Sequence, residues 1–118
     1  MRADIDCALQ LLKRTQPDLK HFPNRLKPAR FRVGSRVLGR YNSFTDTLQL
    51  NARYLGVLDD REARDLIDTL IHELLHANSS RLKQLRDTFL AHPDIQAEAK
   101  RRTDALAEEF NALRCRVR

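Results

Sequence analysis

The chain has 118 residues, of which 42% are hydrophobic and 32% are charged, and its formal net charge is +6. These values fit one small globular domain over residues 1–118, with one hydrophobic core. No apolar run approaches the roughly 20 residues that cross a bilayer, so we expect no membrane partner. The N-terminal stretch MRADIDCALQLLKRTQPD has acids within its apolar part and no small-residue cleavage site, so it is not typical of a secretory signal. We therefore expect a cytoplasmic protein.

The basic residues are scattered along the chain, mainly over residues 25–40 and again over residues 100–118. Such a distribution supports solubility and a loose attraction to polyanions. The interleaved aromatic residues of a single-strand nucleic-acid platform are absent, so nucleic acid is an alternative partner that the composition does not favour. Cys7 and Cys115 lack metal-ligand spacing and do not make a disulfide framework, which favours a reducing compartment.

In chain order, the first expected element is an amphipathic helix over Asp4 to Arg14, because its apolar residues recur at helical spacing. Three prolines then interrupt residues 17–28, which cannot form one regular element. The stretches FRVGSRV (31–37) and TLQLN (47–51) both alternate apolar or small residues with polar ones, and turn residues lie between them. This pattern predicts a small, mostly antiparallel sheet.

A buried helix is expected next. Asp59 is a good N-cap residue, and Glu62 three positions later completes the pattern of a capping box. Apolar residues from Ala63 to Leu74 cover more than half of the helix circumference, so most of its surface is buried. Breaks at residues 78–80 and 92–94 separate this helix from two further helices that form a C-terminal hairpin. The sequence therefore predicts an α+β fold of N-terminal helix, sheet, buried helix and helical hairpin.

Three polar residues, His72, Glu73 and His76, interrupt the apolar pattern of the buried helix. At about 100° per residue, the two histidines lie about 40° apart around the helix and one turn apart along it. Both rings can then approach one point at the roughly 2.0–2.1 Å of a zinc–nitrogen bond. Packing histidines bonded to backbone carbonyls are the alternative, but the five-residue pattern arises by chance in few chains of this size. We therefore expect a zinc site, with Glu73 beside the metal to hold water.

The motif HELLH, within DTLIHELLHA, resembles the active-site helix of the zincin metallopeptidases, and LGRYNSFTDTLQLN resembles the strand pair that precedes that helix in compact members. The resemblance covers roughly residues 37–78. It is strongest to the minimal gluzincins, which include peptidase modules of bacterial toxins, and next to the SprT-like peptidases. The extended metzincin pattern is excluded, because Ser79 and Leu82 stand where it needs glycine and histidine.

This resemblance implies a zinc-dependent endopeptidase. Three protein ligands and a water would complete the zinc site. The metal-activated water would attack the peptide bond, with Glu73 as general base. The substrate would be a protein or peptide, and the chain would act as a module of a larger effector delivered to another cell. Specificity and oligomeric state cannot be read from the sequence.

The third zinc ligand is a glutamate on a later helix in gluzincins and a histidine after a loop in SprT-like peptidases. A helix over residues 81–91 would carry the chain about 16 Å from the motif, and the last helix would return as far. Residues near Glu109 would then come back to the zinc, and Glu109 lies at the edge of the buried face of that helix. Glu109 is the expected ligand, with Glu98, His92 and Glu108 as alternatives.

Other site residues are less closely specified by the sequence. Tyr41, Arg53 or Tyr54 is expected to stabilise the oxyanion. Asp65 or Thr69, on the histidine face of the helix, is a candidate partner for a histidine ring nitrogen.

By the same resemblance, an extended peptide is expected to bind along the sheet edge at Thr47–Asn51. The basic tail over residues 113–118, folded towards the cleft, would give an autoinhibited form. Two alternative functions remain: a SprT-like protease that acts at DNA, and a non-catalytic basic helical protein that binds metal structurally or not at all. Glu73 argues against the second, because structure alone needs no base beside a metal.

Overall fold

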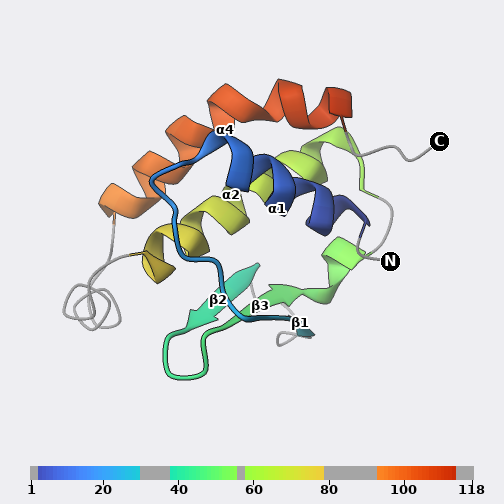
Figure 1. The fold of residues 1–118 in the computed structure, drawn as a ribbon. Coiled ribbons are helices and arrows are strands. Elements are labelled where there is room, and N and C mark those ends of the chain that lie inside the picture. The colour runs from blue at the N-terminus through green and yellow to red at the C-terminus, as the bar shows by residue number, and fades with distance from the viewer. Residues whose placement is uncertain (1–2, 30–37, 56–57, 79–92, 114–118) are drawn as a thin grey trace.

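The computed structural model describes residues 3–29, 38–55, 58–78 and 93–113. In chain order, its elements are α1 (Ala3–Thr15), β1 (Arg25–Ala29), β2 (Gly39–Asn42), β3 (Thr47–Asn51), the 3₁₀ turn η1 (Ala52–Leu55), α2 (Asp60–Ala77) and α4 (Pro93–Leu113) (Figure 1). The predicted α+β class is confirmed, with a helix at the N-terminal end and a long helix towards the C-terminal end. The strand expected over residues 31–37 and the helix expected over residues 81–91 lie outside the described residues.

The described sheet has the strand order β1-β3-β2. β2 pairs antiparallel with β3, and β1 pairs parallel with β3. The sheet is therefore mixed, not mostly antiparallel, because a strand forms at RLKPA, a stretch where prolines were expected to prevent regular structure. Pro28 is compatible with that strand, since β1 is an edge strand and proline is tolerated there. The expectation that Thr47–Asn51 forms the sheet edge is wrong, because β3 is paired on both sides.

α2 begins and ends close to the positions that the sequence predicts. The carboxylate of Asp59 accepts a hydrogen bond from the amide of Glu62 at 2.8 Å, and the Glu62 side chain accepts from the Asp59 amide at 3.3 Å. At the other end, the side-chain nitrogen of Asn78 donates to the carbonyl of Leu74 at 2.8 Å. The capping box satisfies amides that a helix start leaves without partners, and at the other end the Leu74 carbonyl accepts from both the backbone amide and the side chain of Asn78. Both ends of the motif helix are therefore fixed.

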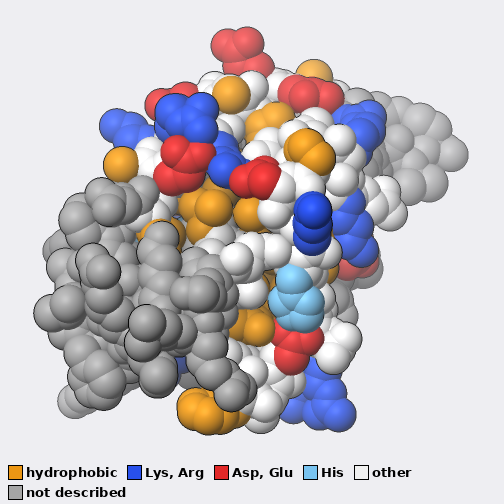
Figure 2. Space-filling model, turned by 60° about the vertical axis from the view of Figure 1, so that its left-hand side comes forward, with side chains coloured by type: hydrophobic (Ala, Val, Ile, Leu, Met, Phe, Trp, Pro, Cys, Tyr) orange, Lys and Arg blue, Asp and Glu red, His pale blue; other side chains and the backbone are white. Residues whose placement is uncertain are grey.

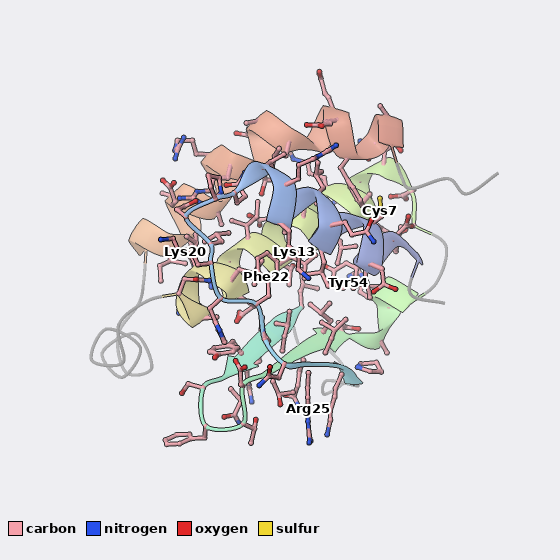
Figure 3. All side chains as sticks on the ribbon, viewed as in Figure 1. Cys7, Lys13, Lys20, Phe22, Arg25 and Tyr54 are labelled. Carbon is pink, nitrogen blue, oxygen red and sulfur yellow. The ribbon has the colours of Figure 1, made fainter. Side chains whose placement is uncertain are left out.

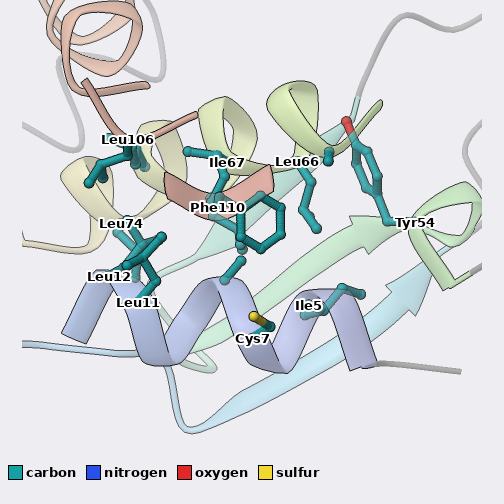
Figure 4. Packing of buried hydrophobic residues seen from close by; sticks show 14 of the residues in the cluster. Ile5, Cys7, Leu11, Leu12, Tyr54, Leu66, Ile67, Leu74, Leu106 and Phe110 are labelled. Carbon is teal, nitrogen blue, oxygen red and sulfur yellow. The ribbon is translucent and has the colours of Figure 1, made fainter. Parts of the chain in front are cut away.

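α2 is the central element of the fold and packs against α4, α1 and β2 (Figure 1). Its apolar side chains join one core with those of α1, β3, η1 and α4 (Figure 4). The largest fully buried apolar side chains are Tyr54, Phe110, Ile5, Leu12, Leu48, Leu50, Leu66, Ile67, Leu70, Ile71 and Leu74. Burial of one such side chain contributes about 1.5–3 kcal/mol relative to its exposed state. The core thus holds α2 firmly, and the motif sits on its C-terminal half.

Cys7 lies in this core, where it is 2% exposed, and it is disulfide-bonded (Figure 4). No cysteine among the described residues is free. The expectation of a reducing compartment assumed that the two cysteines take no part in a disulfide. This assumption is wrong for Cys7. Cys115 lies outside the described residues.

The segment between α1 and β1 passes the C-terminal end of α2. The amide of His21 donates to the side-chain oxygen of Asn78 at 2.8 Å, and the Asn78 side-chain nitrogen donates to the His21 carbonyl at 2.8 Å. Lys13 Nζ lies 5.2 Å from the centroid of the Phe22 ring, whereas Arg25 points away from the helices (Figure 3). The two hydrogen bonds to Asn78 connect the segment before β1 with α2, the helix that carries the motif, and the contact of Phe22 connects it with α1.

No helix within the described ranges combines the length and the apolar character that a membrane crossing needs.

On the surface, a charged cluster joins α4 to the segment after α1. Arg102 donates to Glu98 at 2.7 Å and to Asp18 at 2.6 Å, and Arg101 also pairs with Glu98. The two guanidinium groups lower the pKa of the Glu98 carboxyl to about 2.

We expect Glu98→Gln to destabilise the protein at neutral pH, with a difference that shrinks as pH falls from 4.5 towards 2 and disappears below it. A carboxylate whose pKa falls on folding contributes stability above its unfolded value, and this stability disappears as pH falls through the folded value. For Glu98, this loss of stability falls in the pH range between the unfolded pKa of 4.5 and the folded pKa of about 2. Urea unfolding of both proteins across this interval measures the difference. A difference that persists undiminished at the acid end would contradict the role assigned to the ionised carboxylate.

Candidate metal centre

His72, Glu73 and His76 come together on the C-terminal half of α2, where one ligand atom from each lies within 4.8 Å of the others. The two histidine Nε2 atoms are 3.2 Å apart, and the ring centroids are 4.9 Å apart. Two nitrogens bound at about 2.05 Å to one tetrahedral zinc lie about 3.3 Å from each other. The histidine pair therefore fits zinc. Within the described ranges, no other group of three potential ligands is this close.

Glu73 is buried beside the histidine pair and is 8% exposed. The backbone of Tyr41, on β2, lies close enough to the Glu73 carboxyl to lower its pKa. Burial raises the pKa of the Glu73 carboxyl to about 7, while the Tyr41 amide and the positive charge of Arg40 oppose this rise. A general base works best when its pKa lies near the working pH. A pKa near neutrality is thus compatible with a general base at Glu73.

A cleft with a volume of about 540 Å³ opens beside the motif, between α2, α4 and the start of β2. His72 and Glu73 line it. The side chains that line the rest are mostly polar and include Asp65, Asp68, Thr69, Gln96, Lys100 and Thr103. This cleft leaves the motif open on the side of His72 and Glu73.

α4 runs antiparallel to α2 (Figure 1). The hydroxyl of Thr103 lies 3.4 Å from a carboxylate oxygen of Asp68, towards the N-terminal half of α2. Gln96, nearer the start of α4, lines the same cleft as His72. The N-terminal half of α4 is therefore the part that lies near the motif.

Glu109 lies towards the other end of α4, about 24 Å along the helix from its first residue. Its carboxylate accepts a hydrogen bond from Arg14 at 3.1 Å on an exposed surface. The structure does not bring Glu109 to the histidine pair, because α4 starts near the motif and leads away from it, whereas the sequence argument assumed a return. Glu98 and Glu108 do not join the pair either. His92 lies outside the described residues.

The three candidates for oxyanion stabilisation have other partners and do not line the cleft. The hydroxyl of Tyr54 is fully buried and lies 3.3 Å from that of Thr69. The hydroxyl of Tyr41 donates to Asp46 at 2.8 Å, and Arg53 pairs with the capping glutamate of α2 at 3.6 Å. Thr69 and Asp65, the candidate partners of the histidine rings, both line the cleft, and Thr69 uses its hydroxyl towards Tyr54.

Gly39 is a site residue that the sequence argument missed. It lines the cleft where β2 passes close to Thr69 of α2. Glycine inside a strand pattern indicates a close approach of another backbone or side chain, so the signal was present in the sequence.

Comparison with known proteins identifies no relative: no family model, no curated protein and no solved structure matches the chain. The function is therefore inferred from the arrangement of the motif residues, from the cleft beside them and from the resemblance of the motif itself.

Proposed function

We propose that the protein is a zinc-dependent endopeptidase. The observation that carries the proposal is the group of His72, Glu73 and His76, with ligand atoms within 4.8 Å of one another, two histidine nitrogens 3.2 Å apart and a buried glutamate beside them, at the side of an open cleft. Bound zinc would polarise the carbonyl of the peptide bond and make water a better nucleophile near neutral pH. His72 and His76 are the residues that hold the metal.

Glu73 accepts the proton of the attacking water and delivers it to the leaving amine. Its burial supports this role, because a desolvated carboxylate is a stronger base than a solvated one. An extended peptide enters the cleft between α2 and α4, beside β2, which is the edge strand of the described sheet next to α2. Glu109, the ligand expected from the sequence, lies away from the histidine pair, as do Glu98 and Glu108. His92 is therefore the candidate for the third ligand that the described residues do not exclude, and a comparison of Glu109→Ala with His92→Ala tests it.

The charge distribution supports a peptide substrate over a nucleic acid. A DNA-binding surface needs cations free to replace the counterions of the phosphates. Several arginines instead form ion pairs with acids of the same chain: Arg14, Arg53, Arg64, Arg101 and Arg102. Basic and acidic side chains are interspersed on the face in Figure 2. We therefore place the SprT-like reading, with action at DNA, second.

The cellular setting is proposed from the motif resemblance to toxin peptidase modules. The chain would act on a protein in the cytoplasm of another cell, as a module of a larger effector. A small catalytic domain with an open cleft suits an unfolded segment or a loop of such a protein.

The test is metal content and hydrolysis of an unfolded protein substrate by the wild type, Glu109→Ala and His92→Ala, with exposed Glu108→Ala as the matched control. We expect about one zinc per wild-type chain, and hydrolysis that stops with a chelator and returns with zinc. The variant that loses zinc names the third ligand. A wild type that takes up no zinc after reconstitution would overturn the proposal, and one that binds zinc without hydrolysis would leave a metal-binding structural protein.

A further inference from the structure

The orientation of β2 is fixed by its pairing with β3. The amide of Asn51 donates to the carbonyl of Leu38 at 2.8 Å, so the backbone groups of residue 38 face β3. In an antiparallel pair, this direction alternates along the strand. The amides of Gly39 and Tyr41 therefore face outwards, away from the sheet. The outward amide of Tyr41 is thus on the side of β2 that the Glu73 carboxyl can reach, and the Tyr41 backbone lowers the pKa of that carboxyl.

β2 can lie this close to α2 only because residue 39 has no side chain. A Cβ atom at Gly39 would lie 2.7 Å from Cγ2 of Thr69, which is shorter than real carbon contacts. Its next neighbours, Cδ2 of Leu50 and the carbonyl of Gln49, would both be 3.3 Å away, where a shift of a few tenths of an ångström suffices. The methyl group of Thr69 is thus the main obstacle to a side chain at this position.

Thr69 cannot easily turn its methyl group aside. The side chain is 8% exposed, and its hydroxyl lies 3.3 Å from that of the fully buried Tyr54. Threonine is branched at Cβ, so few side-chain rotamers are available within a helix. A side chain at residue 39 would therefore displace β2 and not Thr69.

The outer end of the Tyr41 side chain is held in place by a hydrogen bond from its hydroxyl. This hydroxyl donates to Asp46 at 2.8 Å, and Asp46 also lies 2.6 Å from a ring nitrogen of His21. Displacement at residue 39 would thus tilt β2 about this anchor and move the Tyr41 amide relative to Glu73.

We propose that Gly39 is a positioning residue for the general base. Its missing side chain lets β2 lie against α2, so that the Tyr41 amide holds the Glu73 carboxylate beside the two histidines. The inference rests on the proposed peptidase function, but the hydrogen bond itself can be measured in metal-free protein.

The experiment compares Gly39→Ala, Thr69→Ser and the double variant. Thr69→Ser removes the obstructing methyl group and keeps the hydroxyl towards Tyr54, so it serves as the matched control. We expect Gly39→Ala to lower kcat by about tenfold or more, since a displacement near 1 Å can cost on the order of a hundredfold. KM and zinc content should change little. The double variant should recover most of the lost kcat, because the methyl group is gone.

Hydrogen exchange of the Tyr41 amide gives a readout that needs neither metal nor substrate. We expect faster exchange in Gly39→Ala, return towards the wild-type rate in the double variant, and the fastest exchange in Glu73→Ala, which lacks the acceptor. A general loss of stability would instead accelerate exchange across the core, and Thr69→Ser would not reverse it.

A second pair of variants tests the donor itself and can be used even if Gly39→Ala does not fold. Tyr41→Ala and Tyr41→Pro both lose the hydroxyl, but only proline lacks the amide, and an outward amide on an edge strand forms no ladder bond. We expect kcat to be about tenfold lower in Tyr41→Pro than in Tyr41→Ala.

Three results would overturn the inference. The first is unchanged exchange of the Tyr41 amide in Glu73→Ala. The second is a wild-type kcat in Gly39→Ala, or equal kcat values in the two Tyr41 variants. The third is a loss of kcat in Gly39→Ala that Thr69→Ser does not rescue. A wild type that hydrolyses no peptide would overturn the proposed function and this inference together, even if the exchange rates behave as expected.

Discussion

Replacement of Glu73 by glutamine is expected to abolish peptide hydrolysis and to leave the zinc content unchanged. The glutamine side chain has nearly the same shape, and its oxygen can still accept the hydrogen bond from the Tyr41 amide. It cannot take a proton from water, so general-base catalysis is lost. Such catalysis typically contributes about 10²–10⁴-fold to the rate. Elemental analysis and kcat on an unfolded protein substrate, measured on the same preparation, check both parts.

Glu108→Gln is the control for this comparison, because Glu108 is an exposed acid on α4. It should retain both zinc and activity. If Glu73→Gln lost zinc, Glu73 would be a ligand and not a base. If it kept zinc and more than a tenth of the wild-type kcat, another group would carry the proton.

Local signals predicted the motif helix well. Asp59 and Glu62 form the expected capping box, and the apolar residues from Ala63 to Leu74 occupy the core. The histidine pair converges as its four-residue spacing requires. These features depend on contacts within one helix, where residue spacing fixes geometry. The part of the candidate site that lies on a single element could therefore be read from the sequence.

Features that depend on how elements meet were not predictable in the same way. The position of Glu109 depends on where α4 starts relative to α2, and helix length alone does not determine this. The parallel pairing of β1 depends on contacts between residues far apart in the chain. Pro28 also argues against a strand in the sequence pattern, because proline is rare within strands. The disulfide bond of Cys7 likewise joins positions that carry no local signal.

The expected result for His76→Ala is loss of zinc and of the stability that zinc binding contributes. A ligand that binds only the folded state, present at about 100 times its Kd, stabilises it by about 2.7 kcal/mol. For a domain of this size, that corresponds to a shift in Tm on the order of 10 °C. Thermal unfolding with added zinc and with a chelator measures the shift. Wild type and Glu73→Gln should show it, and His76→Ala should not.

His21→Ala is the matched control, because His21 is an exposed histidine that pairs with Asp46 outside the motif. Its absolute Tm can fall through loss of that contact, but its response to zinc should equal that of the wild type. An equal response in His76→Ala would place the zinc elsewhere and remove the basis for hydrolysis at this site. Since Glu73→Gln keeps the zinc response and loses kcat, while His76→Ala loses both, the two substitutions together separate binding of the metal from its use.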